Sequence, residues 1–129
     1  MRAVYDLFTT VSTASLGARL VTAKSVAVSS TDTYYSKQMQ VSEDGELGFE
    51  LRTTGTPTGT LTLWFSNFED PDEADDDDWI QDTSWSPTNP AGSAIKTLYS
   101  VTGIHARVAR VKYVNSSGSG TLAGKQVVS

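Results

Sequence analysis

The sequence predicts an all-β fold, namely a single-domain antiparallel β-sandwich of about eight strands over residues 1–129. Two observations favour it. Segments with apolar residues at alternate positions recur between clusters of Gly, Pro, Ser, Thr and Asn, and no stretch keeps a helical period for three turns. Strands spaced by about 8 to 12 residues are typical of two-sheet sandwiches and jelly rolls. The chain is long enough to bury one core without disulfides.

Three strands are predicted in the first third of the chain. They cover residues 4–11, 19–29 and 34–41, where apolar and polar side chains alternate in places. Residues 1–15 are apolar enough to dock on a partner but show little periodicity. An N-terminal arm is therefore the alternative for this first segment.

The clearest strand of the central part covers residues 46–53. Leu47, Phe49 and Leu51 fall on one face, while polar residues and a glycine fall on the other. This period of two predicts one face against the core and one face in water. Residues 54–59, with one proline and two glycines, predict a turn because a strand ladder cannot continue through them.

Residues 59–68 form the most hydrophobic predicted strand. Its apolar side chains occupy both faces, with Leu61, Leu63 and Phe65 on one and Trp64 and Phe68 on the other. We therefore expect both faces to be buried, by the core or by a partner. An acidic loop follows, and the chain re-enters the sheet at residues 79–80. Residues 93–101 fit either a strand or one short helical turn.

The last quarter of the chain, residues 103–129, predicts two antiparallel strands joined by a Ser/Gly turn at residues 115–120. The side chains of the first strand divide between two faces, with Ala109, Val111 and Tyr113 on one and Arg110 and Lys112 on the other. This pattern predicts a half-buried strand whose basic residues point outward.

The composition excludes several classes of protein. Cysteine is absent, so the chain has no disulfide, thiolate metal site or cysteine nucleophile. No apolar run approaches the roughly 20 residues of a membrane span, and the N-terminal segment lacks the continuous apolar stretch of a signal peptide. We expect a soluble chain with no membrane partner, made without classical export.

Acidic residues are concentrated in one segment, residues 69–78, which we call the acidic loop. It holds eight of the fifteen Asp and Glu residues, and the remaining seven face ten Lys and Arg residues, a formal charge of +3 for the rest of the chain. Its carboxylates suit a hard cation such as Ca²⁺, but the EF-hand spacing is missing. We favour a solvated loop, or one docked on a basic neighbour, over a metal site. If it docks on a second copy, Arg107, Arg110 and Lys112 are the natural partners.

Residues for catalysis are not marked in this sequence. His105 is the only histidine, so a Ser–His–Asp arrangement must include it, but no GxSxG elbow occurs. Glu43, Glu46 and Glu50 lie close in sequence without a sign that one is desolvated. We therefore predict that the chain is not an enzyme and needs no cofactor, and we place His105 at a sheet edge or interface. A small hydrolase that uses His105 is a third hypothesis.

The three tryptophans raise the question of sugar binding. Exposed aromatic rings on a β-sandwich stack on carbohydrate, and Trp85 lies in a loop-like segment from which it can join Tyr34 and Tyr35 in a glycan platform. For Trp64 and Trp79 we favour packing in the core beside the acidic loop. A nucleic-acid partner is not expected, because basic residues are few and the acidic loop repels phosphate.

The second half of the chain resembles a family of phage proteins. The succession GTPTGTLTLWFSN, Trp79-Ile80 and GIHARVARVKYVNSSGSGTL is similar to tailed-phage capsid decoration (cement) proteins and related head-fibre base domains. In these, a "tG-tGtltv-gSn" strand precedes a Trp and an "a-yvRv-yt-sGtGtl" hairpin. The matching residues are Gly55, Gly59, Thr60, Leu61, Ser66, Asn67, Trp79, Ala106, Arg107, Arg110, Val111, Tyr113, Ser117, Gly118, Gly120 and Leu122. The acidic loop replaces a shorter connection of the family.

The resemblance implies a jelly-roll-like, usually trimeric sandwich on the outer surface of the phage head. It would be made in the host cytoplasm and become part of the virion, where it would bind the major capsid protein and other copies of itself at three-fold or quasi-three-fold positions. Such binding stabilises an assembled shell by mass action and requires no active site. The residues expected at these interfaces are Trp64, Phe68, Arg107, Arg110 and Lys112. A carbohydrate-binding module of a fibre or baseplate is the alternative.

Overall fold

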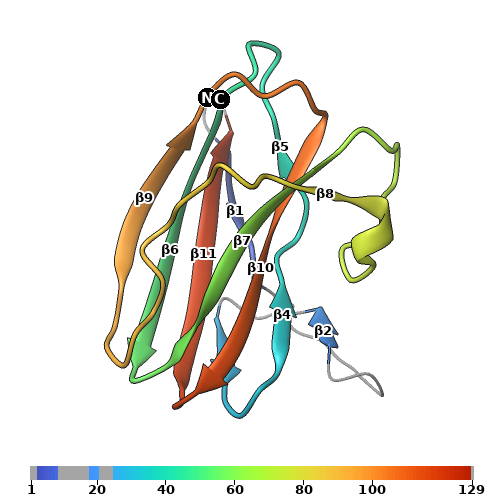
Figure 1. The fold of residues 1–129 in the computed structure, drawn as a ribbon. Coiled ribbons are helices and arrows are strands. Elements are labelled where there is room, and N and C mark those ends of the chain that lie inside the picture. The colour runs from blue at the N-terminus through green and yellow to red at the C-terminus, as the bar shows by residue number, and fades with distance from the viewer. Residues whose placement is uncertain (1–2, 9–17, 21–24, 129) are drawn as a thin grey trace.

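Two β-sheets packed face to face form the protein in the computed structural model, which describes residues 3–8, 18–20 and 25–128 (Figure 1). These residues contain eleven strands, no α-helix and a single 3₁₀ turn, η1, over Asp76–Asp78. The predicted all-β sandwich is therefore confirmed.

The first sheet has five strands in the order β1-β11-β6-β9, with β3 also paired to β11. Its members are β1 (Ala3–Asp6), β3 (Val26–Val28), β6 (Leu47–Gly55), β9 (Lys96–Val101) and β11 (Gly120–Val128). The second sheet has six strands in the order β2-β4-β10-β7-β8, with β5 also paired to β10. Its members are β2 (Ala18–Leu20), β4 (Thr33–Tyr35), β5 (Met39–Gln40), β7 (Thr58–Ser66), β8 (Ile80–Gln81) and β10 (Val108–Ser117).

The strand pairs are nested along the sequence. Strands near the two ends of the described chain pair with each other, and strands nearer the middle pair with each other. β1 pairs with β11, β4 and β5 pair with β10, β6 pairs with β9, and β7 pairs with β8, all antiparallel. The β11–β6 and β10–β7 pairs then join these ribbons into the two sheets. A long hairpin rolled up in this way is a jelly roll. The β2–β4 pair is parallel, which departs from the purely antiparallel prediction.

The predicted hairpin of the last quarter is wrong in its pairing. β10 pairs with β7 and β4 in the second sheet, whereas β11 pairs with β6 and β1 in the first. Both strands are thus flanked by partners that are distant in sequence. The Ser/Gly turn between them is an arch that crosses from one sheet to the other.

A second arch connects β6 to β7, and the two arches stack on each other. The Thr56 N–H donates to the Ser119 carbonyl at 2.9 Å. Gly118 has φ +75° and lies so close to the Thr56 carbonyl that a Cβ atom would overlap it. Glycine is required at this position because the backbone is left-handed and a neighbouring backbone fills the side-chain space.

The core between the sheets contains the side chains that the alternation predicts to face it. Those from β6, β7 and β10 that are buried there are Leu47, Phe49, Leu51, Leu61, Leu63, Ala109, Val111 and Tyr113. The Tyr113 hydroxyl donates to Asn115 Oδ1 at 2.8 Å, and burial raises its pKa to about 12. A buried tyrosine with its hydroxyl satisfied stabilises the core as an apolar ring does.

The described part of the predicted N-terminal arm is built into the sandwich. β1 pairs with β11, and Leu7 and Phe8 are fully buried in the core. The Leu7 N–H donates to the Gly124 carbonyl at 2.8 Å. Residues 1–2 and 9–15 of that arm lie outside the described residues. For residues 93–101, the strand alternative is correct from Lys96 onward, and the helical turn is not observed.

Candidate interaction surface

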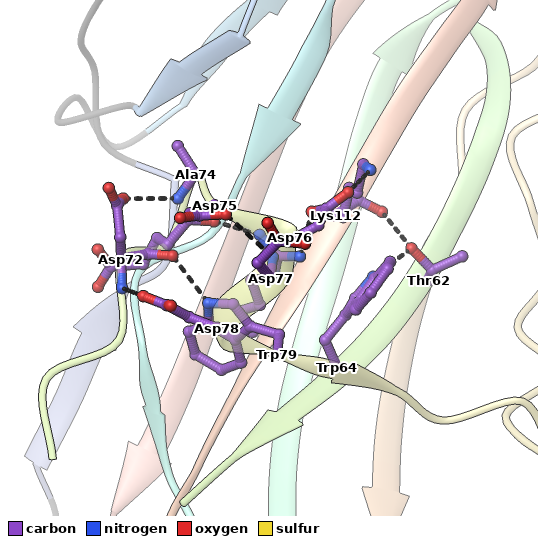
Figure 2. Close-up of polar contacts among 12 residues, drawn as sticks. Thr62, Trp64, Asp72, Ala74, Asp75, Asp76, Asp77, Asp78, Trp79 and Lys112 are labelled. Carbon is purple, nitrogen blue, oxygen red and sulfur yellow. Dashed lines mark hydrogen bonds and ion pairs between the residues drawn. The ribbon is translucent and has the colours of Figure 1, made fainter. Parts of the chain in front are cut away.

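The acidic loop folds back onto the outer face of the second sheet (Figure 2). Its last residues form η1, which Asp75 caps by accepting a hydrogen bond from the Asp77 N–H at 3.0 Å. The Asp72 N–H donates to Asp78 Oδ2 at 2.9 Å, and the Asp72 carbonyl accepts from Trp79 Nε1 at 2.8 Å. These local bonds hold a segment rich in like charges in one compact conformation.

One carboxylate of the loop contacts two cations of β10. Arg110 Nη2 donates to Asp76 Oδ1 at 2.5 Å, and Lys112 Nζ donates to Asp76 Oδ2 at 2.6 Å. Arg110 Nη1 also donates to the Glu73 carbonyl. We call Asp76, Arg110 and Lys112 the clasp, because they attach the loop to the sheet by charge-assisted hydrogen bonds.

Three aromatic rings surround the Arg110 guanidinium. Its central carbon lies 4.8 Å from the ring centroids of Tyr35 and Trp64 and 5.1 Å from that of Trp79. Lys112 Nζ lies 5.4 Å from the Trp64 ring as well. At these distances the faces of the rings attract the cations. The rings also exclude water, so that Arg110 has 0% of its surface exposed.

The electrostatics of the clasp favour the charged form of Asp76. Burial acts to raise the pKa of this carboxyl, but the hydrogen bonds from Lys112 and Arg110 outweigh burial and hold the pKa below its ordinary value of 3.8. Burial, and after it the charge of Asp76, raises the pKa of Tyr35 above 10.0. The loop therefore stays docked as a salt-bridged unit near neutral pH.

The structure separates the five residues predicted at an interface. Arg110 and Lys112 point away from the core as predicted, and both pair with Asp76 of the acidic loop of their own chain. Trp64 is half-buried beside them, and the prediction that Trp64 and Trp79 pack in the core is wrong, because both rings pack on the Arg110 guanidinium on the outer face of the second sheet. Arg110 in particular has no surface to offer a partner while the loop is docked. Phe68 and Arg107 are exposed, and their interface role remains a prediction.

A groove opens at the end of the sandwich next to the acidic loop. It has a volume of about 390 Å³ and lies between the end of β7, β8 and the β9–β10 connection. The residues that define it are Phe65, Asn67, Phe68, Asp78, Ile80 and His105. Phe68 is 58% exposed and Ile80 is 77% exposed. Two large apolar side chains at one groove mark a surface suited to binding another protein.

Hydrogen bonds between β7 and the β9–β10 connection shape one wall of this groove. The Arg107 N–H donates to Asn67 Oδ1 at 2.9 Å, and Asn67 Nδ2 donates to the His105 carbonyl at 3.4 Å. Ser66 Oγ accepts from the Phe68 N–H at 3.1 Å. The side chain of His105 is exposed at the groove, in the connection that precedes β10.

The three residues predicted as a glycan platform do not lie on one surface. Tyr34 is fully buried in the core, where its ring stacks on Tyr113, and Tyr35 lies on the opposite face of β4 under Arg110. Trp85 was expected to be exposed, but its ring packs on Phe49 at 6.1 Å and on Tyr99 at 5.1 Å. Trp85 is half-buried, and its ring packs against the edge of the core.

Within the described ranges, no group of three or more His, Cys, Asp and Glu side chains is arranged to hold a metal ion. The acidic loop shows why, since Asp72, Asp75 and Asp78 direct carboxylate oxygens at backbone N–H groups and Asp76 at the two cations. None of the helical segments in the described part of the chain has the length and hydropathy to cross a bilayer.

Sequence reasoning missed Ile80 and Leu98, which are the most exposed large hydrophobic residues described, at 77% and 80%. A signal for Leu98 was present. Thr97, Tyr99 and Val101 share one phase of the strand, so Leu98 falls in the opposite, outward phase. For Ile80, the two-residue length of β8 leaves no pattern to interpret.

Comparison with known proteins adds no assignment. The chain matches no protein-family model, and no curated protein sequence matches it.

Proposed function

We propose that the chain is a decoration protein of a tailed-phage head, a non-enzymatic protein that binds the outer surface of the assembled shell and stabilises it. Its partners are the major capsid protein and other copies of itself, three of which act together. The jelly-roll strand order supports this proposal, because viral capsid proteins are among the common users of that fold. Lectin domains share it too, so the fold alone does not decide.

The main support for the proposal is the position in the structure of the residues that match the phage-protein pattern. They are spread over half of the sequence, but ten of the sixteen lie in three places in the structure, and four more, Leu61, Val111, Tyr113 and Leu122, are buried in the core. Gly55, Gly118 and Gly120 lie at the stacked arches, and Gly59 follows the first arch in β7. The clasp region contains Trp79 and Arg110. The groove wall contains Ser66, Asn67 and Ala106, and the Arg107 N–H donates to Asn67 there. Residues that resemble a family and also contact one another support a shared architecture.

Physical logic connects this architecture to the proposed role. A protein that binds the assembled shell better than free capsid subunits shifts the equilibrium toward the shell. Such binding requires an exposed surface on a rigid body. The groove with Phe68 and Ile80 beside the acidic loop offers one, and the exposed Arg107 lies next to it, with its backbone N–H bonded to Asn67 of the groove wall.

The test is binding of the purified chain to empty heads of the phage that encodes it, prepared without the chain. We expect saturable co-sedimentation at a fixed number of copies per head and a higher temperature of shell disruption. Absence of binding, or equal binding to unassembled capsid subunits, would refute the proposal.

Point variants then test the surface. Arg107→Glu reverses an exposed charge next to the groove and is expected to weaken binding to heads. Lys37→Glu is the matched control, because it makes the same charge change at an exposed position between β4 and β5. Equal binding of the two variants would remove Arg107 from the interface.

A further inference from the structure

A second apolar feature lies on the outer face of the first sheet. Leu98 on β9 is 80% exposed, and Lys96 precedes it by two positions on the same face. Arg52 on β6 is the direct cross-strand neighbour of Lys96. We call Leu98, Lys96 and Arg52 the β9 knob, a large apolar side chain accompanied by two cations.

The two cations of the knob are not equally neutralised. Arg52 pairs with Glu50 at 3.2 Å, whereas no carboxylate of the described residues lies within ion-pair distance of Lys96. Like charges directly opposite each other on one sheet face repel. An external carboxylate beside Lys96 would therefore be favourable.

The groove described above has the complementary properties. Phe65 and Ile80 face each other across the β7–β8 pair, and because β8 is only two residues long the sheet offers little cover beyond Ile80. Asp77 and Asp78 line the same groove. Among the described residues, no Lys or Arg pairs with either of these carboxylates. The groove is thus an apolar surface with an anionic rim.

We propose that the β9 knob of one copy binds in the groove of a second copy, with Leu98 between Phe68 and Ile80 and with Lys96 beside Asp77. A volume of about 390 Å³ has room for a leucine side chain. β9 and the η1–β8 region lie on opposite sides of the molecule (Figure 1), so one copy can use both surfaces at once.

The contact is heterologous, since it joins two different patches. Such contacts form a closed ring when the rotation between copies allows it and an open filament when it does not. A second copy is the occupant that we infer, because the charges and apolar side chains of the two patches are complementary within one sequence. The inference deepens the proposed function, because it names the contact between copies and places it in the same groove; its tests use the purified chain without heads, so its failure can be told apart from a failure to bind heads.

Sedimentation velocity of the purified chain over a range of concentrations is the first test. The wild type is expected to form assemblies that include species larger than a dimer. Leu98→Asp and Ile80→Asp are each expected to be monomeric. Both side chains are exposed, so the variants should fold, which thermal denaturation checks.

A mixture of the two variants tests the heterologous geometry. Leu98→Asp keeps an intact groove and Ile80→Asp keeps an intact knob, so the mixture is expected to form a dimer that grows no further. A mixture that stays monomeric, while the wild type associates, overturns the proposal, because it indicates a contact between identical patches. A wild type that is monomeric at all concentrations also overturns it.

Charge reversal tests the ionic part of the contact. Lys96→Glu and Asp77→Lys are each expected to weaken association by about two- to fivefold, and a chain that carries both substitutions is expected to regain it. Val114→Asp is the control, because Val114 is an exposed apolar residue of β10 that lies toward the arches rather than the groove. Association that Val114→Asp weakens as much as Leu98→Asp does would refute the assignment of the knob.

Discussion

Replacing Asp76 with alanine removes the carboxylate that faces both cations of the clasp. Arg110 is 0% exposed, so its guanidinium would stay among three rings with the Glu73 carbonyl as its remaining acceptor. Breaking a buried ion pair in this way costs about 3 to 5 kcal/mol. Asp76 itself is 41% exposed, so water replaces part of the lost interaction. We therefore expect Asp76→Ala to lower the free energy of unfolding by about 2 to 3 kcal/mol.

Arg110→Met is the informative partner variant. Methionine fills the space between the rings without a charge, and Asp76 keeps Lys112 and water as partners. This variant loses only the cation–π attraction and the hydrogen bonds of one guanidinium, so we expect it to lower the free energy of unfolding by about 1 kcal/mol. The double variant should cost little more than Arg110→Met alone, because no buried charge is then left without a partner. The coupling energy between the two positions is thus about 2 kcal/mol.

Urea denaturation followed by tryptophan fluorescence measures these free energies, and Trp64 and Trp79 report directly on the clasp. The decisive comparison is which of the two single variants loses more free energy of unfolding. Two results would refute this reasoning. One is a larger loss of unfolding free energy in Arg110→Met than in Asp76→Ala, and the other is a double variant whose loss equals the sum of the two single losses within about 0.5 kcal/mol. Either result would mean that Asp76 does not act by neutralising the buried guanidinium.

Three further predictions concern pH and the arches. Because the folded pKa of Asp76 lies below 3.8, its stabilisation is complete above that pH and is lost as the pH falls through the folded pKa, so urea titrations should show a weaker acid dependence for Asp76→Asn. The pKa of Tyr113 is raised to about 12, so its stabilisation is complete below pH 10.0 and is lost as the pH rises toward 12, and alkaline unfolding followed by circular dichroism should be less steep for Tyr113→Phe. Gly118→Ala should cost more than about 3 kcal/mol in thermal denaturation because its Cβ meets the Thr56 carbonyl, whereas Gly103→Ala, with φ +72° and open space around it, should cost about 1 to 2 kcal/mol; equal costs would contradict the overlap.

The faces of the strands could be predicted from the sequence, but their partners could not. Leu47, Phe49 and Leu51 lie in the core as their alternation predicts, because a period of two depends only on local geometry. The pairing of β10 with β7 instead of β11 depends on which strands bury the most surface together, which no local pattern reports. Adjacent strands with a short Gly-rich turn therefore predicted a hairpin where the fold has an arch.

The sequence predicted the residues of the candidate site but not which of them contact one another. The acidic loop and its basic counterparts Arg110 and Lys112 are visible in the sequence, but charge complementarity does not say whether the partner belongs to the same chain. Trp85 illustrates a second limit. A tryptophan in a Pro-rich loop suggests exposure, yet the tertiary structure places its ring against Tyr99 and Phe49.

The nested pairing of the strands has a consequence for how the chain folds. Among the described residues, β1 pairs only with β11 and β5 only with β10, while β4 pairs with β10 and with the short β2, so most sheet contacts of the N-terminal strands require β10 and β11. Folding must close the longest loops of the chain before it gains these contacts, which makes a topology of this kind slow to fold. During synthesis β1 and β5 therefore have no strand partner among the described residues until β10 and β11 are made, and the native sandwich forms only after β11 has left the ribosome.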